Sequence, residues 1–84
     1  MYFITYTKKA RDDIPELKSA GLEKKAKVLI ELIRENPYQP VPGYEKLKGS
    51  LSGVFSRRIN IRHRLLYQVI EEEKTVKILR LWTQ

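Results

Sequence analysis

The sequence predicts an α+β fold with the element order β-α-α-β-β-β, in which an antiparallel sheet carries a two-helix hairpin on one face. Two observations predict this fold. Apolar residues in the first half of the chain recur at the three- and four-residue spacing of amphipathic helices, whereas the second half holds three runs rich in β-branched and aromatic residues. The 84 residues are too few for a second core, so residues 1–84 are expected to form a single domain.

The first strand and the first helix are predicted within the first 21 residues. Residues 2–6 read Tyr-Phe-Ile-Thr-Tyr, a β-branched and aromatic run that is typical of a strand. Thr7 can cap the helix that follows, because its hydroxyl can accept a hydrogen bond from a backbone N–H of the first turn. Gly21 is a natural end for this helix. The apolar residues on one face of the helix are Ala10, Ile14 and Leu17.

The second helix is predicted from Leu22 to Asn36. One of its stripes is apolar, with lysines and glutamates opposite. Pro37 ends the helix, because the residue before a proline is disfavoured in the helical conformation. The short link between the two helices predicts a hairpin that lies on an apolar surface. The stripe consists of Leu22, Ala26, Leu29 and Ile33.

A long connection precedes the remaining strands. Residues 36–53 hold three of the four prolines and three of the four glycines, and so long a connection in a compact domain is usually functional or disordered. The later separators, at Arg62–His63 and at residues 71–74, are short enough for antiparallel hairpins. The three strands are predicted at residues 54–61, 64–70 and 75–82.

The net charge of +7 is concentrated in one segment. Residues 1–44 carry eight basic and six acidic side chains (+2), residues 45–67 carry six and one (+5), and residues 68–84 carry three of each (0). A basic surface attracts polyanions through long-range steering and counterion release, and nucleic acid is their commonest form. The alternative is that the charge serves only solubility.

Alternation along the strands separates the arginines of this basic segment. Ser56 and Arg58 are expected on one face of the sheet, and Arg57 and Ile59 on the other. Because a tight turn joins the two strands, Arg58 and Arg64 are expected nearly opposite one another. Like charges side by side are destabilising without an anion between them. Spacing alone therefore leaves two interpretations open, a phosphate site or arginines that are solvated or paired with glutamates.

Composition excludes several kinds of site. The chain has no cysteine, which excludes disulfides, thiolate chemistry and sulfur-based zinc sites. A single histidine makes a His-based metal site improbable, so neither a metal nor a cofactor is expected. The apolar run at the N-terminus precedes its lysines, the reverse of a secretory signal, and no apolar run is long enough to span a bilayer. These features predict a cytoplasmic protein without membrane contact.

A series of short motifs within residues 44–69 points to a family. A glutamate is followed by Leu-Lys, Leu-Ser-Gly, an aromatic residue, Ser-Arg-Arg-Ile and His-Arg-Leu-Leu-Tyr. This order resembles the Txe/YoeB branch of the RelE superfamily, bacterial toxins that cleave messenger RNA on the ribosome and are silenced by an antitoxin encoded beside them. The resemblance extends over the whole chain and implies the RelE-like fold. It also implies two partners: messenger RNA on the ribosome and an acidic antitoxin of the YefM/Axe type. A second copy of the chain is a further candidate partner, because a domain this small has a marginal core.

The resemblance also implies roles for individual residues. Metal-independent RNA cleavage needs a base for the ribose 2′-hydroxyl, cations that hold the phosphate and an acid for the leaving 5′-oxygen. Glu45 matches the family's base, and Arg58 and Arg64 match the arginines that hold the phosphate. The residues expected to hold the flanking RNA backbone are Lys46, Lys48 and Arg57.

Two further positions of the motif carry expectations. His63 lies at the predicted hairpin turn, where the family does not use it chemically, and it is expected to be structural or to pack against RNA. Gln84 occupies the position of the family's terminal catalytic histidine, and the tyrosine that follows in the family is missing. Glutamine cannot release a proton at neutral pH, so catalysis is expected to be weak.

Two functions therefore remain open. The first is a ribosome-dependent endoribonuclease that inhibits translation, attenuated in this chain. The second is a non-catalytic protein that keeps the surface for RNA, ribosome or antitoxin. A DNA-binding regulator is a weaker third alternative, because neither predicted helix carries a recognition pattern.

Overall fold

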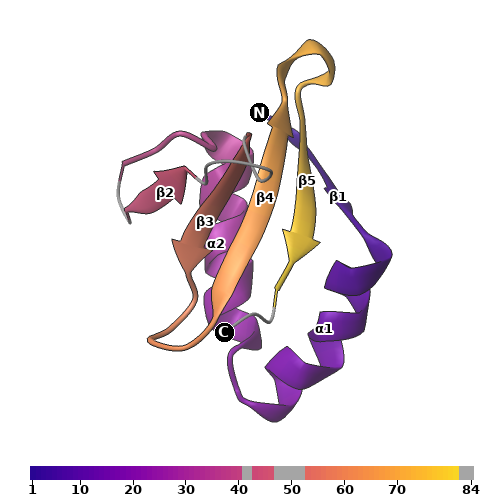
Figure 1. The fold of residues 1–84 in the computed structure, drawn as a ribbon, viewed down its shortest axis with the longest axis vertical. Coiled ribbons are helices and arrows are strands. Elements are labelled where there is room, and N and C mark those ends of the chain that lie inside the picture. Colours follow the sequence, from indigo (N-terminus) through magenta and orange to yellow (C-terminus); the bar gives the residue numbers. More distant parts are fainter. Residues whose placement is uncertain (41–42, 47–52, 82–84) are drawn as a thin grey trace.

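The computed structural model describes residues 1–40, 43–46 and 53–81, which form one five-stranded sheet and two α-helices (Figure 1). The sheet order is β1-β5-β4-β3-β2. The first and last strands pair in parallel, and the other neighbours are antiparallel. The elements are β1 (Phe3–Tyr6), α1 (Lys8–Ser19), α2 (Glu23–Glu35), β2 (Tyr44–Lys46), β3 (Val54–Arg58), β4 (Arg64–Ile70), a 3-10 turn η2 (Glu71–Glu73) and β5 (Thr75–Arg80).

The predicted α+β fold is confirmed, with two differences in the sheet. A short strand, β2, forms inside the predicted connection and pairs with β3 at the edge of the sheet. In addition, β1 adds to β5 in parallel, so the sheet is mixed rather than antiparallel. Neither difference has a signal in local periodicity, because three residues are too few to show alternation and a sheet edge accepts a strand in either direction.

Helix α1 begins at the predicted cap. The hydroxyl of Thr7 accepts a hydrogen bond from the Ala10 N–H at 3.1 Å, as the cap prediction requires. The same hydroxyl donates to the Leu79 carbonyl at 2.9 Å, so the cap also fastens the helix to β5. After the helix, Gly21 adopts a φ of +71°, a left-handed conformation that favours glycine. Among the described helices, neither the 12 residues of α1 nor the 13 of α2 could cross a membrane.

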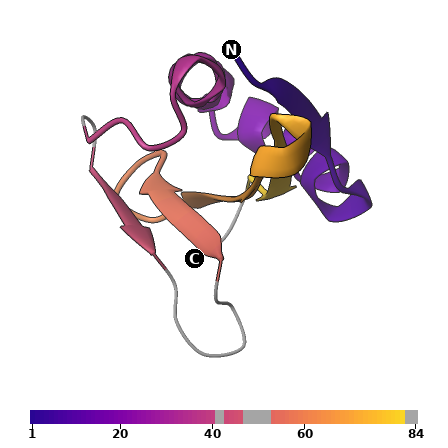
Figure 2. The ribbon, with the colours of Figure 1, turned by 90° about the horizontal axis from the view of Figure 1, so that it is seen from above.

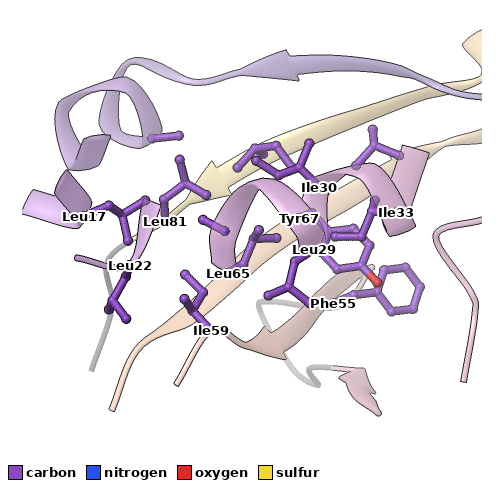
Figure 3. Close-up of a cluster of buried hydrophobic side chains, with 14 residues drawn as sticks. Leu17, Leu22, Leu29, Ile30, Ile33, Phe55, Ile59, Leu65, Tyr67 and Leu81 are labelled. Atoms are coloured by element: carbon purple, nitrogen blue, oxygen red, sulfur yellow. The ribbon is translucent and has the colours of Figure 1, made fainter. Parts of the chain in front are cut away.

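Helix α2 covers one face of the sheet, behind β3 and β4 in Figure 1 and above them, seen end-on, in Figure 2. All four residues of its predicted stripe are buried there. Together with one face of α1 and the inner residues of the strands they form a single apolar cluster (Figure 3). This arrangement leaves the opposite face of β2, β3 and β4 without a covering helix in the described chain. The cluster consists of Ala10, Leu17, Leu22, Ala26, Leu29, Ile30, Ile33, Phe55, Ile59, Leu65, Tyr67, Val76, Ile78 and Leu81.

A buried carboxylate fastens α1 to the end of β5. Asp13 accepts hydrogen bonds from Arg80 Nε at 2.8 Å, from Arg80 Nη2 at 3.1 Å and from the Leu81 N–H at 2.9 Å. These bonds to Asp13 raise the pKa of the Arg80 guanidinium further above its ordinary value, so the guanidinium stays charged. The ion pair offsets the free-energy cost of burying the Asp13 carboxylate. Arg80, which lies outside the basic segment, thus has a structural role.

Candidate active site

An open pocket of about 400 Å³ lies on the sheet face that the helices leave uncovered. Its walls come from three neighbouring strands, β2, β3 and β4, and from the residue before β2. Three of the four residues predicted to act catalytically line it. The lining residues are Gly43, Tyr44, Glu45, Ser56, Arg58 and Arg64.

Strand register brings these side chains together. Arg58 is the direct antiparallel partner of Arg64, as alternation and the short turn predicted. Glu45 is the partner of Ser56, so it shares the face of the two arginines. Residues more than a dozen positions apart in the sequence thus meet across three adjacent strands.

One ion pair crosses the pocket. Arg64 Nη1 lies 3.3 Å from Glu45 Oε1 and also donates to Ser56 Oγ at 3.3 Å. The Glu45 side chain is 65% exposed and that of Arg64 is 33% exposed. Exposed ion pairs of this length contribute little to stability. The pair can therefore open, which would leave Glu45 accessible to a proton donor and Arg64 to an anion.

The charges of the pocket suit a phosphodiester. Two guanidinium groups on one face repel each other until an anion lies between them, and each can bind two phosphate oxygens through its fork of N–H donors. The Glu45 carboxylate can accept a proton from a hydroxyl next to that phosphate. Among residues 1–40, 43–46 and 53–81, no three His, Cys, Asp or Glu side chains cluster as metal ligands.

Arg57 does not belong to this pocket, and its predicted contact with the RNA backbone is wrong. The residue is 1% exposed and lies on the core face of β3. Its Nε donates to the Tyr67 hydroxyl at 3.0 Å, and its Nη2 donates to the carbonyls of Pro37 at 3.1 Å and Gln39 at 2.8 Å. Its position one residue from Arg58 already placed it on the opposite face. Only the fold shows that the acceptors there are carbonyls and a tyrosine.

His63 is also buried, with 4% exposure, which does not fit the predicted contact with substrate and favours the structural alternative. Its backbone closes the turn between β3 and β4. The His63 N–H donates to Asn60 Oδ1 at 2.7 Å, and the His63 carbonyl accepts from the Ile59 N–H at 2.8 Å. His63 is not among the residues that line the pocket.

The remaining predicted residues lie outside the pocket or outside the described chain. Lys46 is exposed on β2, and alternation directs it to the face opposite Glu45, where its contact with flanking RNA stays a prediction. Lys48 and Gln84 lie outside the described residues. Three pocket residues, Gly43, Tyr44 and Ser56, received no predicted role. Ser56 had a signal, because it shares the alternation of Arg58.

The family match and the similar known proteins agree on one family. Residues 6–82 match the family described as "YoeB-like toxin of bacterial type II toxin-antitoxin system". The chain is 40% identical over 52 residues to Toxin YoeB of Synechocystis sp., a match that covers 62% of this chain and 60% of that relative's length. It is 39% identical over 57 residues to Toxin YoeB of Escherichia coli, which covers 68% of each chain.

Solved structures show the same fold over nearly the whole chain. A YoeB/ParE toxin from Agrobacterium tumefaciens superposes with a TM-score of 0.88 at 25% identity, covering 98% of both chains. The YoeB-YefM toxin-antitoxin heterotetramer from Staphylococcus aureus matches with a TM-score of 0.83 at 31% identity, covering 100% of this chain and 98% of that one. A YoeB dimer from the same organism matches with a TM-score of 0.82, covering 99% of this chain and 97% of that one.

Proposed function

The chain belongs to the family of YoeB-like toxins of bacterial type II toxin-antitoxin systems, and from this premise we propose that it is a metal-independent endoribonuclease that cleaves messenger RNA on the ribosome. The observation that carries the proposal is the meeting of Glu45, Arg58 and Arg64 in one open pocket. A ribosome-dependent activity would place the protein in the cytoplasm and would inhibit translation.

The proposed reaction is an in-line displacement at phosphorus. Glu45 accepts the proton of the ribose 2′-hydroxyl, and the 2′-oxygen forms a bond to the adjacent phosphorus as the bond to the 5′-oxygen breaks. The products are a 2′,3′-cyclic phosphate and a 5′-hydroxyl, and the leaving 5′-oxygen takes up a proton from an acid. Arg58 and Arg64 hold the phosphate oxygens and stabilise the charge that develops on them.

The two functions that the sequence left open differ in whether the chain supplies an acid for the leaving 5′-oxygen. Gln84 stands where the resemblance places a histidine, and an amide side chain does not supply a proton at neutral pH. We therefore propose that the chain binds its substrate normally but cleaves it slowly. The second candidate is a protein derived from such a toxin that binds RNA, ribosome or antitoxin without cleaving RNA. The glutamine at position 84, in place of the family's histidine, favours this candidate too.

A binding experiment tests the arginine pair. We expect Arg58→Ala and Arg64→Ala each to weaken association with single-stranded RNA and with ribosomes by about tenfold to a hundredfold, because each removes charge-assisted hydrogen bonds to phosphate. Lys24→Ala removes the same charge from the exposed side of α2 and is expected to weaken it less than about threefold. Equal losses for all three variants at one ionic strength would mean that only diffuse charge matters.

A groove beside the pocket suits an acidic antitoxin. It has a volume of about 400 Å³ and lies between α2 and the end of β3, next to Arg58, which lines both hollows. We propose that an antitoxin of the YefM type places apolar side chains in this groove and carboxylates on its rim. A YoeB relative was solved as a complex with YefM and another as a dimer, which supports both kinds of partner for this chain. The floor consists of Val28, Leu29, Leu32 and Ile59, and the rim of Lys24, Lys25 and Arg58.

Placing a negative charge on the apolar floor of the groove tests whether an acidic antitoxin binds there. Val28 is 60% exposed, so Val28→Glu should fold normally and weaken an acidic antitoxin encoded beside this chain by about tenfold or more, since it sets like charges against each other. Ile61→Glu introduces the same charge at a residue that is 88% exposed and does not line the groove, and it should bind like the unchanged chain. Affinity and the rise of the melting temperature with antitoxin concentration measure the effect. Equal affinities for both variants, or binding without salt dependence, would contradict the assignment.

A further inference from the structure

We propose that Arg57 is a positioning residue: it holds β2 at the edge of the sheet and thereby places the Glu45 carboxylate in the pocket. The proposal rests on the proposed function only where it calls Glu45 the base. Its structural part concerns how β2 is held, and it can be tested without any cleavage.

Strand β2 needs such an anchor. It has three residues and lies at the end of the sheet order, so it pairs with β3 alone. Three residues of ladder give few hydrogen bonds against the conformational entropy of the chain, and an edge strand of this length is marginal without further contacts. The carboxylate that the pocket uses nevertheless sits at the centre of this strand, on Glu45.

The guanidinium of Arg57 contacts the chain just before β2 and the strand itself. Its Nη2 donates to the carbonyls of Pro37 and Gln39, at 3.1 and 2.8 Å, in the segment that leads from α2 to β2. Its central carbon lies 4.8 Å from the centre of the Tyr44 ring, within cation–π range. The incoming segment and the first residue of the strand are therefore held by one buried side chain.

Tyr67 of β4 connects this anchor to the centre of the sheet. Its hydroxyl accepts from Arg57 Nε at 3.0 Å and donates to the Pro37 carbonyl at 2.7 Å. Burial raises the pKa of the Tyr67 hydroxyl, and Arg57 offsets only part of that shift, so the hydroxyl keeps the proton it donates. The ring stacks on Phe55 with centroids 5.4 Å apart (Figure 3). Phe55 in turn packs edge-on against Tyr44, with centroids 5.5 Å apart.

Because successive side chains of a strand point to opposite faces, anchoring Tyr44 also fixes the position of the Glu45 carboxylate. The Tyr44 ring lies against the buried arginine, and alternation directs the next side chain, that of Glu45, to the other face of the strand, where Ser56 and the two pocket arginines lie. A rotation or shift of Tyr44 would move Glu45 relative to Arg64, which lies 3.3 Å away across the ion pair. A displacement of about 1 Å in a catalytic group can cost on the order of a hundredfold in rate.

The geometry also explains why this residue is an arginine. Three acceptors on two different segments are bonded by Nε and Nη2 of one planar group, whereas a lysine ammonium is a single point at the end of a flexible stem. Arg57→Lys keeps the charge and is expected to lose part of this fork. Tyr67→Phe is a milder change that removes one hydroxyl and keeps the ring.

Hydrogen exchange and cleavage kinetics test the proposal together. In Arg57→Lys and Tyr67→Phe we expect the amides of Tyr44–Lys46 to exchange about tenfold faster or more, while those of β4 and β5 keep their protection. On ribosome-bound messenger RNA we expect kcat to fall by about tenfold to a hundredfold with KM changed less than about threefold. The control is Leu17→Ala, which destabilises the core at α1, far from β2 in the sequence and on another element.

Each outcome decides the proposal. Faster exchange confined to β2 supports it, also if no form of the chain cleaves RNA, in which case the ribonuclease proposal alone fails. Equal acceleration in all strands would show that Arg57 contributes only to global stability and would overturn it. Unchanged exchange in β2, or the same fall of kcat in Leu17→Ala at matched melting temperature, would also overturn it.

Discussion

Glu45→Gln is expected to lower the rate of messenger RNA cleavage on ribosomes by ~10²–10⁴-fold, the usual contribution of a general base. The amide has the size of the carboxylate and can still accept a hydrogen bond from Arg64, so the pocket should keep its shape. It cannot accept the proton of the 2′-hydroxyl. Because the change also removes a negative charge beside the phosphate, RNA binding should stay equal or become tighter. Single-turnover cleavage and equilibrium binding on the same RNA separate the two effects.

Lys46→Gln is the matched control for this substitution. It removes one charge from the neighbouring residue of β2, whose side chain faces away from the pocket. Its expected effect is a modest loss of RNA binding without a change in the rate of the bound complex. Equal loss of rate in the two variants, or cleavage by Glu45→Gln at the unchanged rate, would remove Glu45 from the role of base.

Replacing Gln84 by histidine and adding a tyrosine after it is expected to raise the cleavage rate by ~10²–10⁴-fold, because an imidazolium can protonate the leaving 5′-oxygen at neutral pH. RNA binding should change little, since the arginines that hold the phosphate are the same in both forms. Cleavage on ribosomes and growth inhibition in bacteria measure the gain. Adding tyrosine while keeping Gln84 shows which of the two residues supplies it.

The gain must depend on the pocket if the proposed mechanism holds. Glu45→Gln in the restored chain should remove most of the new activity. If the chain with Gln84 already cleaves as fast as the restored one, the acid lies elsewhere in the molecule. His63, the histidine of the chain, is buried at the β3–β4 turn, so an exposed group would have to be sought.

Local sequence determined most of the fold and the outline of the site. Helix α2 follows from apolar residues at helical spacing, and α1 from the Thr7 cap, because both signals lie within a few residues of the structure they specify. Alternation and a tight turn were enough to place Arg58 opposite Arg64. The motif resemblance added Glu45, which on its own is an ordinary acidic residue in a long connection.

Only the tertiary structure decided what the other polar residues do. Arg57 and Arg58 are adjacent and chemically identical, yet one holds backbone carbonyls in the core and the other lines the pocket. The acceptors of Arg57 are 10 to 20 positions away, and no local pattern encodes that they will be unpaired and near it. The short strand β2 and the parallel addition of β1 to β5 depend likewise on edges that exist only after the sheet has formed. Periodicity specifies which face a side chain occupies, whereas the partner it meets there is set by segments that are distant in sequence.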